Sequence, residues 1–420
     1  MDVMHSTPRP AAAAFILCLA LVVLSACQGV PTLTTTPPGF RVETYLDGVT
    51  YPVSMAFAPD GRLFYTERHT GIEPPLTGGI RVVAADGTLQ ARPFATVDLP
   101  DDTPHRDKGL LGITLDPGFS TNGYLYAFRT ALPDGSNPNE HGEVVRYTSV
   151  LSGTDWIGTD PTPIVDDLPA SADCCHNGGE IAFGPDGTLY VTVGDTEDWT
   201  QGQNLQTRAA TILRYNPDGT IPADNPYVSN PAVDPAIYAY GLRNVFGLDW
   251  HPETGELYAT DNGPNCNDEL NHIVAGGNYG WADSFRGEVR GALHPPYIEP
   301  VFVWEQPIGP TAVEFYTGDT LPGFQGDLFL STWDGRSDHY GNGTLFRVTL
   351  AEDGSRASVV SLFENCNRDQ AEGMMNMLDV ETGSDGNLYF SCQEALFPAP
   401  AHTGAIYRLV PDSPAATPQR

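Results

Sequence analysis

The feature that most constrains the fold of this chain is a β-turn signal followed by a Leu-aromatic strand, which recurs along the sequence. The six copies read DGRLFYTE, NGYLYAFR, DGTLYVTV, TGELYATD, QGDLFLST and DGNLYFSC. The intervals between their leucines are 62, 64, 68, 71 and 60 residues, for Leu63, Leu125, Leu189, Leu257, Leu328 and Leu388. Spacing this regular indicates one copy in each of six repeating units.

Each unit contains further strands around its Leu-aromatic copy. Most copies follow another short apolar strand, as in SMAFAPDG and EIAFGPDG, and many precede a third, as in ILRYN and IYRLV. Units of this size, with room for a fourth strand, are typical of propeller blades. We therefore predict an all-β fold over residues 40–412, a six-bladed β-propeller with four-stranded blades.

The two ends of the predicted propeller suggest how the ring closes. An orphan strand, FRVETYL, precedes the first unit, and the last unit ends with IYRLV. The N-terminal strand should complete the last blade, because closure removes the open sheet edges that invite aggregation.

The first 26 residues are predicted to be a lipoprotein signal peptide. Arg9 precedes an apolar run over residues 11–26 that is too short to span a bilayer comfortably. The run closes on Leu24-Ser25-Ala26-Cys27, so Cys27 should become the lipidated N-terminus. An ordinary signal peptide with a chance cysteine is the alternative.

Residues 27–39 are Pro/Thr-rich and are predicted to be a tether, and residues 413–420 a polar tail. We therefore expect an exported protein that is anchored to the cell envelope. Its only expected contact with a membrane is the lipid anchor, since no later segment is apolar enough to cross one.

The chain is strongly acidic, with 53 Asp and Glu against 21 Lys and Arg and a formal net charge of -32. This charge argues against electrostatic binding of nucleic acid or anionic lipid. It fits an extracytoplasmic body that binds cations.

After the predicted processing, the body retains five cysteines, Cys174, Cys175, Cys266, Cys366 and Cys392. An odd number leaves at least one unpaired. Export permits disulfides, and Cys366 is expected to pair with Cys392 because both lie in the last repeat. A bridge between the neighbours Cys174 and Cys175 would be strained, and one of them could instead reach Cys266.

The densest chemical signal is CCHNGGEIAFGPDGTLYVTVGD, in which His176 comes just before the innermost strand of a blade. Inner strands line the channel of a propeller, and the loops entering them form its mouth. His176 is therefore a candidate general base, with Gly178 and Gly179 letting a ligand approach the backbone. A purely structural histidine is the alternative.

The second signal is YGLRNVFGLDWHP, where Arg243 and Asn244 also precede an inner strand. Arg offers fixed donors to an anionic or quinone oxygen, and Asn offers both a donor and an acceptor. A buried Arg that ties blades together is an equally good interpretation of the spacing.

The third signal is DNGPNCNDELNHIVAGGNYGW, residues 261–281. Asp261, Asp268 and Glu269 lie near the backbone carbonyls of Gly263 and Pro264 in the sequence. Hard oxygen ligands of this kind suit Ca²⁺, although the spacing does not match an EF-hand loop.

These motifs, together with ILRYNPDGTIPADNPY, resemble the glucose/sorbosone dehydrogenase family, and the resemblance spans nearly the whole mature chain. The family's fold is a six-bladed propeller, in agreement with the repeat count. Its soluble enzymes bind pyrroloquinoline quinone (PQQ) and Ca²⁺ at the channel mouth and oxidise an aldose at its anomeric carbon to a lactone. In such enzymes the quinone carries the redox chemistry and the protein positions the reactants.

The resemblance assigns roles to the residues of the three signals. His176 would be the base that removes the hydroxyl proton, and Arg243 and Asn244 match the pair that contacts the quinone and the substrate. The carbonyls of Gly263 and Pro264 match those that hold the cofactor's Ca²⁺.

Two acidic residues, Asp268 and Glu269, match the positions of a further metal site in some family members. The resemblance also implies a small-molecule sugar as substrate and an external electron acceptor.

The chain departs from the family pattern at several site positions. Asp107 stands where Gln is usual, and Cys175 stands where an acid immediately precedes the base. Asp334 replaces a lysine, and Asn376 and Leu378 replace two arginines.

These changes remove three cations that would otherwise face a tricarboxylate cofactor, at a cost of several kcal/mol if nothing replaces them. The nearby cations in the sequence that could compensate are Lys108, Arg336 and Arg368.

The sequence therefore predicts a PQQ- and Ca²⁺-dependent sugar dehydrogenase at the cell surface. The alternative is a non-catalytic propeller that binds a carbohydrate or a protein at the channel mouth. A Ca²⁺-dependent lactonase would need several carboxylates pointing into the channel, and the motifs do not resemble that pattern.

Overall fold

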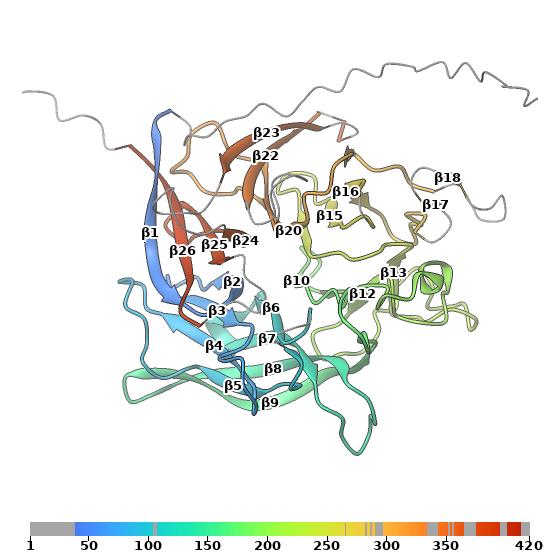
Figure 1. The fold of residues 1–420 in the computed structure, drawn as a ribbon, viewed down its shortest axis with the longest axis horizontal. Coiled ribbons are helices and arrows are strands. Elements are labelled where there is room, and N and C mark those ends of the chain that lie inside the picture. Colours follow the sequence, from blue (N-terminus) through green and yellow to red (C-terminus); the bar gives the residue numbers. More distant parts are fainter. Residues whose placement is uncertain are drawn as a thin grey trace, which may run out of the picture.

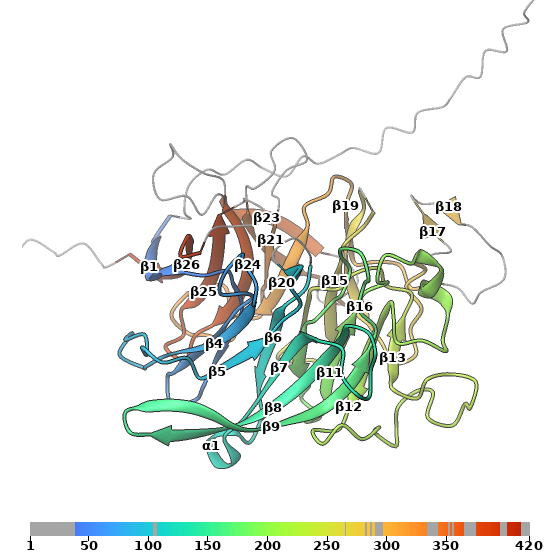
Figure 2. The same cartoon turned by 60° about the horizontal axis from the view of Figure 1, so that its bottom comes forward.

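The computed structural model describes residues 38–103, 107–264, 266–281, 284–285, 288–289, 297–333, 343–351, 353–354, 357–364, 375–394 and 401–412. Six four-stranded antiparallel sheets are arranged in a ring (Figures 1 and 2). The predicted six-bladed β-propeller is confirmed. The predicted signal, the lipidation site Cys27, most of the tether and the tail lie outside the described residues.

The blades follow one another along the chain, and within each blade the strands run from the innermost to the outermost. Blade 1 consists of β2 (Pro52–Phe57), β3 (Leu63–Glu67), β4 (Thr77–Val83) and β5 (Ala95–Asp98). Blade 2 consists of β6 (Leu110–Leu115), β7 (Tyr124–Ala131), β8 (His141–Ser152) and β9 (Asp155–Leu168). Blade 3 consists of β10 (Ile181–Phe183), β11 (Leu189–Val193), β12 (Thr211–Tyr215) and β13 (Ile237–Tyr240).

The second half of the ring repeats this order. Blade 4 consists of β14 (Gly247–Trp250), β15 (Leu257–Asp261), β16 (Asp268–Ile273) and β19 (Phe302–Trp304). Blade 5 consists of β20 (Pro310–Phe315), β21 (Leu328–Thr332), β22 (Thr344–Leu350) and β23 (Ala357–Glu364). Blade 6 consists of β24 (Met375–Thr382), β25 (Leu388–Glu394), β26 (Gly404–Pro411) and β1 (Phe40–Val49).

In the part of the chain that the structure describes, three short elements lie outside the blades. They are helix α1 (Phe119–Asn122), the 3-10 helix η2 (Trp199–Gln203) and the hairpin of β17 (Ser284–Phe285) with β18 (Glu288–Val289). Among the described residues, no helix is long and apolar enough to span a membrane.

The ring closes as the sequence predicted. β1 pairs antiparallel with β26, with Arg41 opposite Val410 and Leu46 opposite Ile406. The first described strand of the chain thus becomes the outer strand of the last blade, and β26 is not left as an open edge.

The repeat leucines explain why the blades stack. Each lies at or next to the start of the second strand of its blade, and all six are at most 3% exposed, for Leu63, Leu125, Leu189, Leu257, Leu328 and Leu388. Apolar side chains at the same position of every blade pack between neighbouring sheets, which fixes the ring and the positions of the loops at its two ends.

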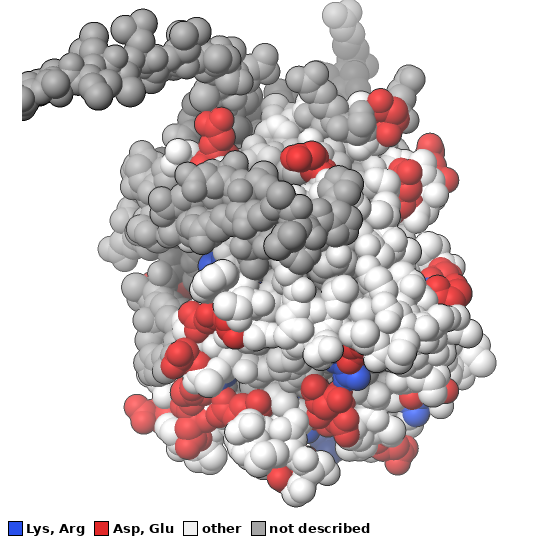
Figure 3. Space-filling view, turned by 90° about the vertical axis from the view of Figure 1, so that its right-hand side faces the viewer, with Lys and Arg blue, Asp and Glu red and all other residues white. Residues whose placement is uncertain are grey.

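The surface is acidic, as the net charge requires. On the face shown in Figure 3, red Asp and Glu side chains are scattered over the described surface and blue Lys and Arg are few.

Candidate active site

The three motifs singled out in the sequence meet at one mouth of the channel. β10 and β14 begin soon after the motifs of His176 and Arg243, and β15 ends at Asp261, just before Gly263. In an antiparallel sheet the start of one strand lies beside the end of the next, so these segments converge at one end of the ring. The structure therefore brings His176, Arg243, Asn244 and Gly263 together, as predicted.

His176 is held by a carboxylate that the sequence motifs did not single out. Its Nδ1 lies 2.7 Å from Oδ1 of Asp195, and Oδ2 of Asp195 accepts a hydrogen bond of 2.9 Å from Nε1 of Trp281. A carboxylate at Nδ1 places the proton of the neutral ring there and leaves the lone pair of Nε2 for chemistry. Asp195 ends the conspicuous VTVGD segment, but only the folded ring shows that it faces the histidine.

Arg243 lies against the other nitrogen of this ring. Its Nη2 is 2.8 Å from Nε2 of His176, and its Nη1 donates to the carbonyl oxygens of Asn262 (2.9 Å) and Gly263 (3.0 Å). An arginine is always a donor, so the contact fits a neutral histidine that accepts at Nε2. The guanidinium thus connects the candidate base to the loop of the predicted metal ligands.

Asp261 fixes the backbone of the Arg-Asn pair. Its carboxylate accepts the backbone N–H of Arg243 at 2.8 Å and that of Asn244 at 2.6 Å. Burial raises the pKa of Asp261 to about 7, although these two hydrogen bonds act to lower it. The side-chain oxygen of Asn244 in turn accepts the N–H of Gly178 at 3.2 Å.

Close packing requires glycine at positions 178 and 179, and both also line the cavity at this mouth, so the predicted approach of a ligand to their backbone stays a prediction. Both have positive φ, and a Cβ at Gly178 would lie 2.6 Å from the carbonyl oxygen of Thr192. At Gly179 it would lie 2.6 Å from Leu111. The glycines let the loop before β10 pack closely on its neighbours.

A cavity of about 520 Å³ opens at this mouth. Its polar lining includes Arg68, Asp107, His176, Arg243, Asn244 and Asp268. Its apolar lining includes Tyr51, Val53, Leu111, Phe246, Trp333 and Leu378. A hollow of this size with an apolar wall and a few convergent polar groups is typical of a small-molecule site.

Arg68 is a cation of the site that sequence reasoning missed. It is 4% exposed, and its guanidinium carbon lies 4.0 Å from the centre of the Tyr51 ring. It faces Asp107, whose pKa is raised by burial and lowered in part by Arg68. The motif around Arg68 contains no unusual spacing, so only its place at the end of β3 reveals it.

The predicted metal ligands divide between two cavities. Asp268 accepts three backbone N–H groups, from Gly263 (2.7 Å), Ile308 (2.7 Å) and Gly309 (2.8 Å). Its carboxylate therefore clamps the loop. Glu269 and Pro264 line a second cavity of about 270 Å³, where burial raises the pKa of Glu269 to about 8. Gly263 lines both.

Comparison with known proteins agrees with this geometry. The family described as Glucose / Sorbosone dehydrogenase matches residues 49–396. The chain belongs to this family. It is 25% identical to Aldose sugar dehydrogenase YliI of Escherichia coli (strain K12) over 86% of this chain and 92% of that one.

Two further proteins are similar to this member of the glucose/sorbosone dehydrogenase family. It is 31% identical to Quinoprotein glucose dehydrogenase B of Acinetobacter calcoaceticus over 64% of this chain and 59% of that one. The PQQ-bound Aldose Sugar Dehydrogenase of Streptomyces coelicolor has the same fold, with a TM-score of 0.65, 24% identity and coverage of 90% of this chain and all of that one.

The positions at which the chain departs from its family differ in where they lie. Leu378 lines the first cavity, whereas Asn376 is fully buried within blade 6 and Asp334 lies outside the described residues.

Lys108 does not compensate for the missing cations, because its Nζ contacts Glu140 and Asp102, which do not line the cavity. Arg336 and Arg368 lie outside the described residues. Within the described lining, Arg68 and Arg243 are the two cations.

The adjacent cysteines pair in a way that the sequence did not favour. Cys174 and Cys175 form a disulfide with each other, and Cys266 is free. Cys392 is disulfide-bonded, but Cys366 lies outside the described residues, so their pairing stays a prediction. One carboxylate, that of Glu197, accepts the N–H groups of both cysteines.

Five carboxylates around the channel were not expected from the motifs. Glu180 directly precedes β10, the innermost strand of blade 3. The other four lie on the innermost strands of blades 4 to 6, with Asp249 on β14, Glu314 on β20, and Asp379 and Glu381 on β24. Burial raises the pKa of all five, and mutual repulsion contributes for Glu180, Glu314 and Glu381. Over the described part of the chain, these carboxylates are not grouped closely enough to form a metal centre.

The channel carboxylates should make the protein less stable as the pH rises. Burial, with repulsion from Glu314 and Asp379, raises the pKa of Glu381, so the folded protein keeps a proton that the unfolded chain has released. Stability is therefore lost as the pH rises from the ordinary carboxylate pKa towards the raised value. Glu381→Gln should raise the melting temperature at pH 8 and leave it nearly unchanged near pH 4.

Thermal unfolding of Glu381→Gln and of the exposed control Glu253→Gln at several pH values measures this effect. An equal shift of the melting temperature at pH 4 and pH 8 would show that Glu381 does not hold a proton in the folded state.

Proposed function

We propose that this protein is a PQQ- and Ca²⁺-dependent dehydrogenase that oxidises an aldose to its lactone. The proposal depends on one observation, the series of side-chain contacts from Asp195 through His176 to Arg243 at the mouth of the first cavity. It combines an oriented base with a fixed cation beside a hollow large enough for a small molecule. The PQQ-bound and quinoprotein relatives support the choice of cofactor.

Two guanidinium groups and an apolar wall suit an anionic planar cofactor, while the carboxylates of Asp107, Glu180, Asp268 and Asp379 also line the cavity. Arg68 and Arg243 supply two guanidinium groups to a lining with a broad apolar wall, and Asn244 adds an amide. The carbonyl oxygen of Gly263 accepts one hydrogen bond from Arg243 and keeps a second lone pair for a cation. Arg243, Asn244 and Arg68 would hold the quinone, and the carbonyls of Gly263 and Pro264 would hold Ca²⁺.

The protein's own residues would carry the proton chemistry. Nε2 of His176 would accept the proton of the anomeric hydroxyl. When bound, PQQ would supply the acceptor for the two electrons that leave the anomeric carbon. Asp195 stabilises the imidazolium that forms. The substrate hydroxyl would bind at Nε2 of His176 in place of the guanidinium of Arg243. The N–H group of Arg243 that is released in this way would donate to an oxygen of the substrate or of the quinone.

The test is aldose oxidation by purified protein incubated with PQQ and Ca²⁺, followed by the reduction of an artificial electron-acceptor dye and by detection of the lactone. Dye reduction that requires the aldose, PQQ and Ca²⁺ supports the proposal. A protein that binds the sugar without dye reduction would support the non-catalytic alternative.

Export, lipid anchoring at Cys27 and the use of an external electron acceptor stay predictions. Labelling of cells with a radioactive fatty acid, compared between the wild type and Cys27→Ser, tests the anchor.

A further inference from the structure

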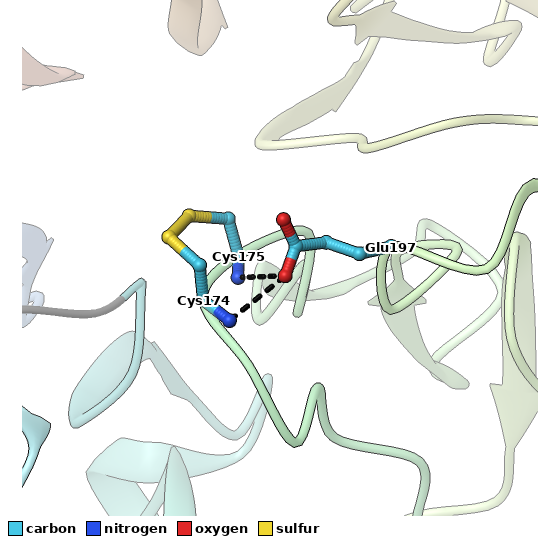
Figure 4. A group of neighbouring side chains, drawn as sticks. All are labelled: Cys174, Cys175 and Glu197. Carbon is cyan, nitrogen blue, oxygen red and sulfur yellow. Dashed lines mark hydrogen bonds between the residues drawn. A yellow bond between two sulfur atoms is a disulfide. The ribbon is translucent and has the colours of Figure 1, made fainter.

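The disulfide between Cys174 and Cys175 immediately precedes the candidate base. Figure 4 shows the pair with Glu197, whose carboxylate lies beside the two backbone N–H groups, while the sulfur atoms are on the other side of the turn. Cys175 lines the first cavity next to His176. The disulfide therefore lies at the wall of the site.

Glu197 holds this turn at its backbone. Its Oε2 accepts the N–H of Cys174 at 2.8 Å, the N–H of Cys175 at 3.2 Å and the hydroxyl of Ser171 at 3.1 Å. Partial burial opposes ionisation, but these hydrogen bonds outweigh it and lower the pKa of Glu197. The carboxylate is therefore charged at neutral pH and binds both amides.

The segment that carries Glu197 also holds His176. The N–H of Glu197 donates to Oδ1 of Asp195 at 2.9 Å, the same oxygen that lies 2.7 Å from Nδ1 of His176. The N–H of Thr196 donates to the carbonyl oxygen of His176 at 3.1 Å. Residues 195–197 thus bind the disulfide turn at one end and the imidazole at the other, in one closed set of contacts.

The backbone of His176 needs such support. Its φ is +60°, in the left-handed region that is unfavourable for a residue other than glycine. A conformation of this kind persists where the surroundings determine it. The disulfide removes the side-chain freedom of the two preceding residues, and Glu197 fixes their amides, so the chain enters His176 in a single conformation.

We propose that the Cys174–Cys175 disulfide and Glu197 act as positioning residues for His176, and that reduction of the disulfide lowers turnover. The inference rests on the proposed function. A dithiol reductant breaks the S–S bond, transfers two electrons and two protons to give the thiols of Cys174 and Cys175, and is itself oxidised to a cyclic disulfide. The freed side chains let the turn leave Glu197, and the imidazole loses its fixed approach to the substrate.

The experiment reduces the full chain as apo-protein, removes the dithiol because it would itself reduce the quinone, and then loads this protein and the oxidised protein with PQQ and Ca²⁺. Reduction should lower kcat about 10- to 10²-fold, since a displacement of about 1 Å costs this much, while KM changes little. Cys174→Ser/Cys175→Ser should match the reduced wild type, and the dithiol should have no further effect on it. Cys266→Ser, which removes only the free thiol, should respond as the wild type does.

A second readout does not depend on activity. In the apo-protein, the Nδ1 proton of His176 should give a downfield NMR resonance, identified by its absence from His176→Gln, and reduction or Glu197→Gln should broaden or remove it. An unchanged resonance and unchanged kcat after reduction would overturn the proposal. A loss of activity on reduction of the double serine variant would also overturn it, because another disulfide would then be responsible.

The two readouts separate this inference from the proposed function. If the oxidised protein oxidises no aldose, the dehydrogenase proposal fails, and the resonance alone still decides whether the disulfide positions His176.

Discussion

Replacing His176 with alanine should lower kcat for aldose oxidation by about 10²- to 10⁴-fold, the usual contribution of a positioned acid or base. The imidazole accepts the hydroxyl proton in the transition state, so its loss should reduce kcat far more than it weakens binding. The measurement is steady-state kinetics with the variant saturated with PQQ and Ca²⁺.

The control for this prediction is His272→Ala, since His272 lies on β16 against the ring of Tyr258, outside the cavity lining. It should keep nearly full kcat. Equal losses in the two variants would point to a general loss of folding, and an active His176→Ala protein would exclude His176 as the base.

Replacing Arg68 with glutamine should weaken the binding of PQQ by about 10- to 10²-fold. A hydrogen bond to a charged group contributes about 1.5–3 kcal/mol, and 1.4 kcal/mol is a factor of ten. Arg68 is one of two cations in the described lining of the cavity. Titration of the apo-protein with PQQ, followed by absorption or calorimetry, measures the change without relying on activity.

A matched surface control is Arg41→Gln, because Arg41 lies on the outer strand β1 and pairs with Glu43. It should bind PQQ like the wild type. Unchanged affinity in Arg68→Gln would show that the cofactor's carboxylates are bound elsewhere in the site.

The structure also indicates where a cation should be added, at position 376 or at position 378, to replace the arginines that the family pattern has there. Asn376 is fully buried, so an arginine there would place an unpaired charge inside blade 6. Leu378 lines the cavity, and Leu378→Arg is therefore the better substitution for adding a cation next to the cofactor.

The fold was predictable from the sequence because its signal is local and repeated. Each Leu-aromatic strand and its turn lie within about ten residues, and six copies identify six blades. Ring closure was predictable as well, because the orphan strand before the first unit was expected to complete the last blade. Convergence of His176 with Arg243 followed from the position of each motif just before an inner strand.

The parts of the site that could not be predicted depend on contacts between distant segments. Asp195 and Glu197 meet His176 and the cysteines only because a tight loop after β11 folds back onto the turn before β10. Arg68 comes from blade 1, more than a hundred residues before His176. The channel carboxylates are spread over blades 3 to 6, and the sequence contains 53 Asp and Glu residues from which no local motif singles them out.

The central claim, that the mouth holding His176 and Arg243 is a quinone site for sugar oxidation, is tested most directly by titrating the apo-protein with PQQ in excess Ca²⁺ and then adding an aldose. We predict saturable binding at one PQQ per chain, followed by an aldose-dependent change of the absorption spectrum to that of the reduced quinone. Binding that appears only in Leu378→Arg, with no spectral change in the wild type, would contradict the claim and favour a non-catalytic propeller.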